Sequence, residues 1–228
     1  MRASWMVGIL LGLLVGQACA YLIVNPENPH YFLETRTGKP VLFASCGGLV
    51  PTSHDFDWQA DAREQAKHDV LYWRIWHFLP WAGESAIWPW ERSSVPGAPM
   101  GGNKLDLNRW NPEYWKRMRG ALALADELGA YAEPHLFDRC GMNPPAPNRW
   151  QGNPWASDNN INRIETPLAS ESGVPAFYQW ENRPRLARYQ QRWVSKFLDE
   201  TCQYQCILYE IENEHLTWAH PDWAIHWA

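Results

Sequence analysis

Residues 111–137, NPEYWKRMRGALALADELGAYAEPHLF, join a helical pattern directly to a strand pattern. Asn111 suits a helix cap and Pro112 suits the first turn, and apolar residues then recur with a helical period until Gly129. Residues 130–137 form a short apolar run that predicts a strand. A helix that passes through so short a connection into a strand is typical of a parallel β/α unit.

The same alternation extends on both sides of this stretch. Apolar runs predict three more strands, and amphipathic stretches predict two more helices. The strands are expected at 39–45, 70–76 and 206–213, and the helices at 57–67 and 185–200. Strands that alternate with helices favour an α/β fold with a parallel sheet.

Long segments follow the expected strands, whereas the connections from helix to strand are short. Residues 81–104 and 138–184 are rich in Pro, Gly and Trp and are expected to be loops. This asymmetry is typical of a barrel whose site lies at the carboxyl ends of its strands. The predicted fold is therefore the N-terminal half of a TIM (β/α)₈ barrel, strands 1–4. Because a closed barrel takes roughly 250 residues, we expect a truncated chain; a half-barrel that closes by dimerising is the alternative.

The first 20 residues have the pattern of a secretory signal peptide. Arg2 supplies the positive start, residues 5–15 are apolar, and residues 18–20 form a small-residue cleavage site. The apolar run is too short to span a bilayer of about 30 Å. We therefore expect a secreted protein with no membrane partner, in which residues 21–228 form one partial barrel domain.

The composition favours a carbohydrate partner. The chain of 228 residues has a formal net charge of −5 and no basic run, which disfavours nucleic acid as a partner. It contains 16 tryptophans, many of them in polar, proline-rich segments. Aromatic rings exposed on loops suit the apolar faces of sugar rings.

Four cysteines follow the expected signal peptide: Cys46, Cys140, Cys202 and Cys206. In an exported protein they allow three disulfide connectivities, and buried thiols are the alternative. Their spacing matches no zinc pattern, so we expect no metal site here.

The last expected strand ends in a run of acids. Glu210, Glu212 and Glu214 are spaced by two, which places all three on one face of a regular strand. Crowded carboxylates raise at least one pKa, and this is how a glutamic acid stays protonated near neutral pH and serves as a proton donor. For Glu210 we favour the alternative, a structural bond to Arg74 or to backbone amides.

A family resemblance rests on these residues. The run 209–214, Tyr-Glu-Ile-Glu-Asn-Glu, resembles the signature that closes the fourth strand in clan A glycoside hydrolases, the group of cellulases, mannanases and related retaining enzymes. The resemblance implies that Glu214 is the general acid/base. It implies that Asn213 bonds the 2-hydroxyl of the sugar next to the scissile bond.

Two further stretches resemble the same clan. Residues 72–75, Tyr-Trp-Arg-Ile, are similar to the second-strand run whose Arg orients the nucleophile, which implies that role for Arg74. Residues 133–135, Glu-Pro-His, are similar to the third-strand ending that carries a substrate-site His, which implies that role for His135. Trp76, His77 and Trp81 follow the second strand and are candidate sugar contacts; core and loop roles are their alternatives.

The chain departs from the clan in two places. His215 follows the Asn-Glu pair where many members have Pro, and the nucleophile that the clan carries on its seventh strand is absent. A retaining glycosidase needs two carboxyl groups about 5–5.5 Å apart. We therefore expect no hydrolysis by this chain alone, and we expect self-association of a half-barrel with unpaired strand edges.

The predicted function is a retaining O-glycoside hydrolase that acts on a polysaccharide or oligosaccharide without a metal or organic cofactor. The first alternative is a non-catalytic carbohydrate-binding protein on a degenerate barrel. The second is a metal-dependent hydrolase on the same barrel that uses His135, Asp138 and His215 as ligands. No HxH or HExxH motif supports the second alternative.

Overall fold

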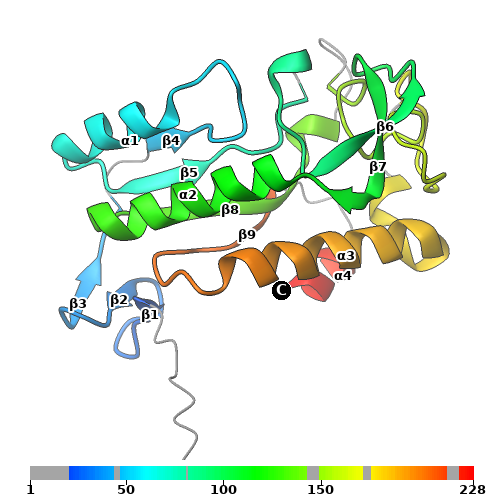
Figure 1. Cartoon of the computed structure of the whole chain (residues 1–228). Helices are drawn as coiled ribbons and strands as arrows, with labels where there is room; N and C mark the ends of the chain where they lie inside the picture. The colour runs from blue at the N-terminus through cyan, green and yellow to red at the C-terminus, as the bar shows by residue number, and fades with distance from the viewer. Residues whose placement is uncertain (1–20, 44–46, 81, 143–148, 172–175, 215–220) are drawn as a thin grey trace, which may run out of the picture.

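The computed structural model describes residues 21–43, 47–80, 82–142, 149–171, 176–214 and 221–228. The chain has a mixed α/β fold around a four-stranded parallel sheet (Figure 1). Its strands, in spatial order, are β4 (Gly47–Leu49), β5 (Tyr72–Ile75), β8 (Tyr131–Asp138) and β9 (Glu210–Asn213). The predicted α/β class with a parallel sheet is therefore confirmed.

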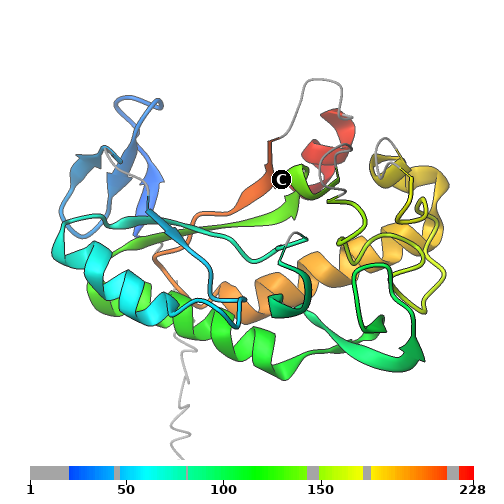
Figure 2. The same ribbon diagram turned by 90° about the horizontal axis from the view of Figure 1, so that it is seen from above.

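Three helices cover one face of this sheet: α1 (Trp58–Lys67), α2 (Pro112–Leu128) and α3 (Pro184–Thr201) (Figure 2). The predicted caps are present, because Asp57 accepts from Ala60 N at 3.1 Å and Asn111 accepts from Glu113 N at 3.1 Å. Gly129 follows α2 with φ 70°, a left-handed conformation that glycine adopts without strain. Local sequence alone therefore sets where α1 and α2 begin and where α2 ends.

The core lies between the sheet and the helices. Trp73 and Ile75 alternate toward the helices from β5, and both side chains are fully buried. They share one core cluster with Met118 and Leu122 of α2 and with Trp193 of α3. Each such side chain contributes about 1.5–3 kcal/mol when it is removed from water, so this layer fixes the sheet on which the site is built.

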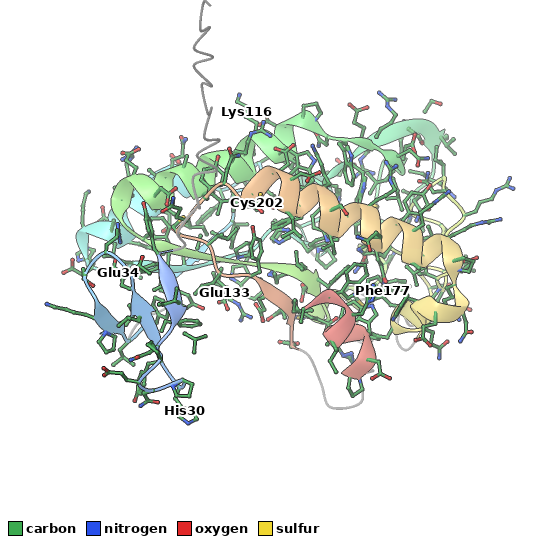
Figure 3. All side chains as sticks on the ribbon, turned by 90° about the horizontal axis from the view of Figure 1, so that it is seen from below. His30, Glu34, Lys116, Glu133, Phe177 and Cys202 are labelled. Atoms are coloured by element: carbon green, nitrogen blue, oxygen red, sulfur yellow. The ribbon has the colours of Figure 1, made fainter. Side chains whose placement is uncertain are left out.

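The opposite face of the sheet is polar. Tyr72 and Arg74 alternate toward it from β5, Glu133 from β8 and Glu210 from β9, and all are partly buried. Figure 3 shows Glu133 on the side of β8 away from α2, whereas Lys116 lies on the outer side of α2. Hydrogen-bonded polar side chains occupy this face, whereas apolar side chains occupy the face that the helices cover.

The prediction that residues 39–45 form the first strand of the parallel sheet is wrong. Its first residues form β3 (Lys39–Val41), which pairs antiparallel with β2 (Phe32–Glu34), and β2 pairs with β1 (Leu22–Val24). The first parallel strand is β4, which begins with Gly47-Gly48 and has no apolar alternation to reveal it. The end of the Gln65 side chain from α1 occupies the space beside Gly47, where a Cβ would displace it.

This small sheet lies near the amino ends of the parallel strands, on the side away from the three helices (Figures 1 and 2). Phe43 connects the two sheets, because its ring stacks on Tyr72 of β5 with centroids 4.4 Å apart. The carboxyl ends of the parallel strands lie at the opposite end of the molecule.

The loop expected at 81–104 is wrong in part, because the chain there forms an antiparallel hairpin. Its strands are β6 (Trp90–Pro96) and β7 (Asn103–Trp110). Gly97, Gly101 and Gly102 between them all have positive φ, which permits the reversal.

The 138–184 segment carries only the short 3₁₀ turns η2 (Cys140–Met142), η3 (Ala176–Tyr178) and η4 (Trp180–Asn182) among its described residues. Trp150 and Trp155 in this segment are almost completely buried, at 0% and 1% exposure. These two tryptophans hold the loop against the core and present no surface to a sugar.

A short helix, α4 (Pro221–Trp227), lies beside the carboxyl end of β9 and buries Trp223. Cys140, Cys202 and Cys206 are free thiols, whereas Cys46 and the expected signal peptide at 1–20 lie outside the described residues. None of the helices in the described ranges is long and apolar enough to cross a bilayer.

Candidate active site

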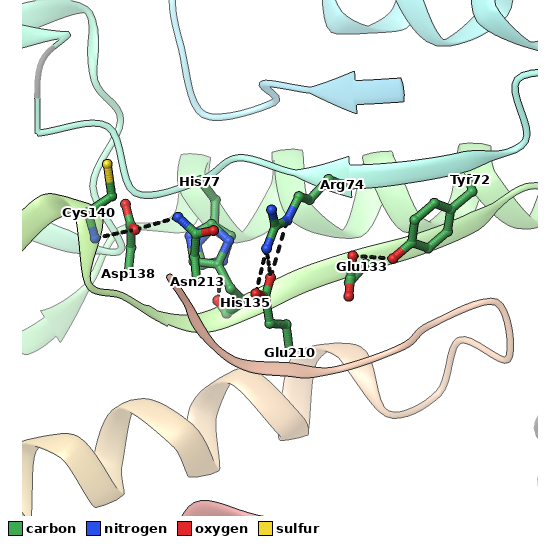
Figure 4. A network of polar contacts seen from close by, with 9 residues as sticks. All are labelled: Tyr72, Arg74, His77, Glu133, His135, Asp138, Cys140, Glu210 and Asn213. Carbon is green, nitrogen blue, oxygen red and sulfur yellow. Dashed lines mark hydrogen bonds and ion pairs between the residues drawn. The ribbon is translucent and has the colours of Figure 1, made fainter. Parts of the chain in front are cut away.

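The carboxyl ends of β5, β8 and β9 bring the sequence-predicted residues to one edge of the sheet (Figure 4). His135 lies opposite Glu210 in the register of β8 and β9, and Asp138 lies opposite Asn213. Arg74 lies opposite Glu133 in the register of β5 and β8. Three landmarks that are far apart in sequence therefore lie on adjacent strands.

Arg74 forms an ion pair with Glu210, which confirms the structural bond favoured for Glu210. Arg74 Nε donates to Glu210 Oε2 at 3.2 Å, and the second guanidinium nitrogen contacts both carboxylate oxygens. Burial alone would lower the pKa of Arg74, but the hydrogen bonds and charge of Glu210 raise it overall. Arg74 is thus a fixed cation at 28% side-chain exposure.

The neighbouring pair on this face is Tyr72 and Glu133, in which the tyrosine hydroxyl donates to the carboxylate. Burial raises the pKa of Glu133, and the bond from Tyr72 opposes that rise. These two side chains occupy the polar face beside Arg74, and their charges help to keep Arg74 protonated.

Asn213 and Asp138 are joined at the strand ends. Asn213 Nδ2 donates to Asp138 Oδ1 at 2.9 Å, and the backbone N–H of Cys140 donates to the same oxygen at 3.0 Å. Both side chains are buried. Burial raises the pKa of Asp138 to about 6, and the charge of Glu214 adds to the rise while the bond from Asn213 opposes it.

The three acids of β9 have three different environments. Glu210 pairs with Arg74, and Glu212 is buried and accepts from the Tyr178 hydroxyl at 2.5 Å. Glu214 is exposed and has φ 57°, so the backbone leaves the strand at this residue. The alternation that would place all three carboxylates on one face therefore ends before Glu214, and a non-glycine residue in this left-handed region is a strained position typical of functional sites.

His77 has a structural role, and its prediction as a sugar contact is corrected. The ring is fully buried, Nε2 donates to the carbonyl oxygen of His135 at 2.6 Å, and Nδ1 accepts from the Tyr114 hydroxyl at 2.7 Å. Burial lowers the pKa of His77 to about 3, so the ring is neutral. His77 ties β5 to β8 and α2 and has no free face for a ligand.

His135 stacks on His77 with ring centroids 4.6 Å apart and meets Trp76 edge-on at 5.7 Å. It is fully buried, and neither ring nitrogen has a hydrogen-bond partner among the described residues. Burial lowers its pKa well below the usual value, with His77 and Arg74 adding to the effect. His135 is thus a neutral polar ring behind Trp76, and because it is as fully buried as His77, its predicted role as a substrate-site histidine is corrected.

A cavity of about 640 Å³ opens at this edge of the sheet. Trp76 lines it, as does Phe56 from the segment after β4, so two aromatic side chains face the space. The polar lining includes Asp55, Arg149 and Cys140. Sequence reasoning missed Asp55, Phe56 and Arg149, because no motif marks them and only the fold brings the segments together.

No protein-family model and no curated protein matches the chain. Within the described ranges, no group of three or more His, Cys, Asp or Glu side chains is arranged to hold a metal ion. Two other predicted residues, Trp81 and the metal-ligand candidate His215, lie outside the described residues.

Proposed function

We propose that the chain is the N-terminal half of a clan A (β/α)₈ barrel and belongs to a retaining glycoside hydrolase with Glu214 as general acid/base. The observation that carries this proposal is the position of Asn213 and Glu214. Asn213 ends β9 opposite Asp138 of β8, and Glu214 follows it, while Arg74 and His135 lie on the two neighbouring strands. The aromatic cavity is lined by Trp76 and Cys140, which directly follow β5 and lie just past the end of β8. The parallel order β4-β5-β8-β9 with three helices on one face supports this proposal.

The proposed roles follow from exposure and bonding. Glu214 is exposed and is the carboxyl group in this cluster that a glycosidic oxygen reaches. Asn213 is held in place and bonds a sugar hydroxyl, while Trp76 offers its ring to a sugar face. Arg74 orients a second carboxylate, and His135 supports Trp76.

The chemistry is a double displacement. A nucleophilic carboxylate attacks the anomeric carbon while Glu214 protonates the leaving oxygen, and Glu214 then takes a proton from the water that releases the sugar. The nucleophile is assigned to no residue of this sequence.

Sugar binding tests the site in the chain as it stands. Titration calorimetry with cellotetraose and mannotetraose should give binding to one of them, and Trp76→Ala should weaken it about tenfold or more, since loss of a well-packed aromatic contact costs at least about 1.4 kcal/mol. Trp150→Phe is the control, because Trp150 is buried in the core. Equal binding by Trp76→Ala and the unaltered chain would contradict the assignment.

A non-catalytic carbohydrate-binding protein is the second candidate. It is favoured by the aromatic cavity itself, which needs no second carboxylate to bind a sugar. Binding without turnover by the product of the complete source gene would select this candidate.

A further inference from the structure

Asp138 and Asn213 are the last residues of the adjacent strands β8 and β9. The two residues are opposite one another in the ladder, and Arg139 N donates to Asn213 O at 3.1 Å. The side-chain bond from Asn213 Nδ2 to Asp138 Oδ1 adds to this ladder (Figure 4). Exposures of 3% for Asp138 and 2% for Asn213 make the contact part of the interior.

The bond to Asp138 determines which atom of Asn213 faces a ligand. An ionised carboxylate only accepts hydrogen bonds, so the atom of the Asn213 amide that faces it must be the nitrogen. The amide is planar, and its oxygen Oδ1 is then directed elsewhere.

The second oxygen of Asp138 has a different environment. Oδ2 is buried and accepts no side-chain hydrogen bond among the described residues, while the backbone N–H of Gly141 stabilises the ionised carboxylate and lowers its pKa. The region around Gly141 is closely packed, because a Cβ there would lie 3.1 Å from Pro80, 3.2 Å from the Asn153 amide nitrogen and 3.6 Å from Oδ2. The Asp138 carboxylate is thus held in one place at the strand end, with Oδ1 directed to Asn213.

We propose that Asp138 is a positioning residue, which orients the Asn213 amide so that its oxygen receives the substrate hydroxyl. This inference rests on the proposed function through the role of Asn213. When Asp138 is ionised, it accepts from the Asn213 amide nitrogen and holds the amide in one orientation. When Asp138 is protonated, it can donate to the amide oxygen instead, so the Asn213 amide is free to turn. The described titratable and charged groups around Asp138 are Glu214, Arg149, Tyr178 and Cys140, of which Glu214 raises its pKa and Arg149 lowers it.

The test without sugar is an NMR titration of the Asn213 side-chain amide in the ¹⁵N-labelled chain between about pH 4 and pH 8. The amide signals should shift with a midpoint near the Asp138 value of about 6. Glu214→Gln should lower the midpoint because a neighbouring negative charge is removed, and Asp138→Asn should abolish the titration. Signals that stay constant, or that titrate equally in Asp138→Asn, would overturn the proposal.

The test with sugar compares two substitutions at Asp138 with the same two tetrasaccharides. Asp138→Ala removes the acceptor and should weaken binding about tenfold, the effect of a lost hydrogen bond to a charged group. Asp138→Asn keeps an acceptor oxygen of the same shape and should restore most of the affinity. Equal loss in both variants, or none in either, overturns the positioning role. Absence of binding by the unaltered chain contradicts the proposed function alone, because the amide titration needs no sugar.

Discussion

His77 and His135 form a stacked pair of neutral rings in the centre of the molecule. The pKa of His77 falls to about 3 on folding from an ordinary value of 6.5, and the pKa of His135 falls in the same direction. Below pH 6.5 His77 and His135 therefore bind protons in the unfolded chain that they do not bind in the folded chain. Their contribution to the free energy of unfolding is fully present above about pH 6.5 and is lost as the pH falls toward their pKa in the folded chain.

From about pH 6 to pH 4 each such histidine lowers the free energy of unfolding by about 1.4 kcal/mol per pH unit, whereas Asp138, whose pKa is raised to about 6, contributes a slope of opposite sign. The effect of His77 is therefore the difference in slope between the unaltered chain and His77→Gln. Urea titrations at a series of pH values measure this slope. His77→Gln should reduce the slope, and the exposed His30→Gln should leave it unchanged. An unaltered slope in His77→Gln would show that His77 is not the titrating group.

At the level of single residues, the crowded acids of the last strand predicted that Glu210 bonds Arg74 or backbone amides, and the structure has the Arg74 pair. It did not predict the Asp138–Asn213 bond, which joins residues 75 positions apart. The roles of Asp55, Phe56 and Arg149 in the cavity also depend on segments that only the folded chain brings together.

Among the elements, α2 was predicted to within one residue because its signals are local. Asn111, Pro112 and Gly129 act through contacts within a few positions. The parallel strand β4 and the β6–β7 hairpin were missed. β4 was missed because two of its three residues are glycine and the strand depends on its contacts with β5 and α1. The hairpin was missed because glycine-rich stretches such as the one at its turn are equally typical of loops.

The cap of α2 has a second contact that the cap of α1 lacks. Asn111 Nδ2 also donates to the carbonyl oxygen of Trp88 at 3.0 Å, which joins the helix to the segment before β6. Asn111→Ala should therefore lower the free energy of unfolding by about 2 kcal/mol, the sum of a cap and a further hydrogen bond. Asp57→Ala removes only the cap of α1 and should cost about 1 kcal/mol. Equal losses in urea unfolding would contradict the second contact.

For the whole molecule, β4 and β9 are the outer strands of the parallel sheet as described. Unpaired strand edges favour association with other chains. We expect the chain expressed alone to dimerise or aggregate, which sedimentation velocity measures directly. A monodisperse monomer that unfolds in one cooperative transition would contradict this expectation.

Chemical rescue is the experiment that distinguishes Glu214 as the acid/base of a retaining glycosidase from a residue without that role. The product of the complete source gene and its Glu214→Gln variant would be assayed on a dinitrophenyl glycoside, with and without azide. We expect slow turnover by the variant, restored by azide with formation of a glycosyl azide of retained configuration, because azide attacks the glycosyl-enzyme without general-base help. Unchanged turnover in Glu214→Gln, or loss that azide does not restore, would contradict the acid/base role of Glu214.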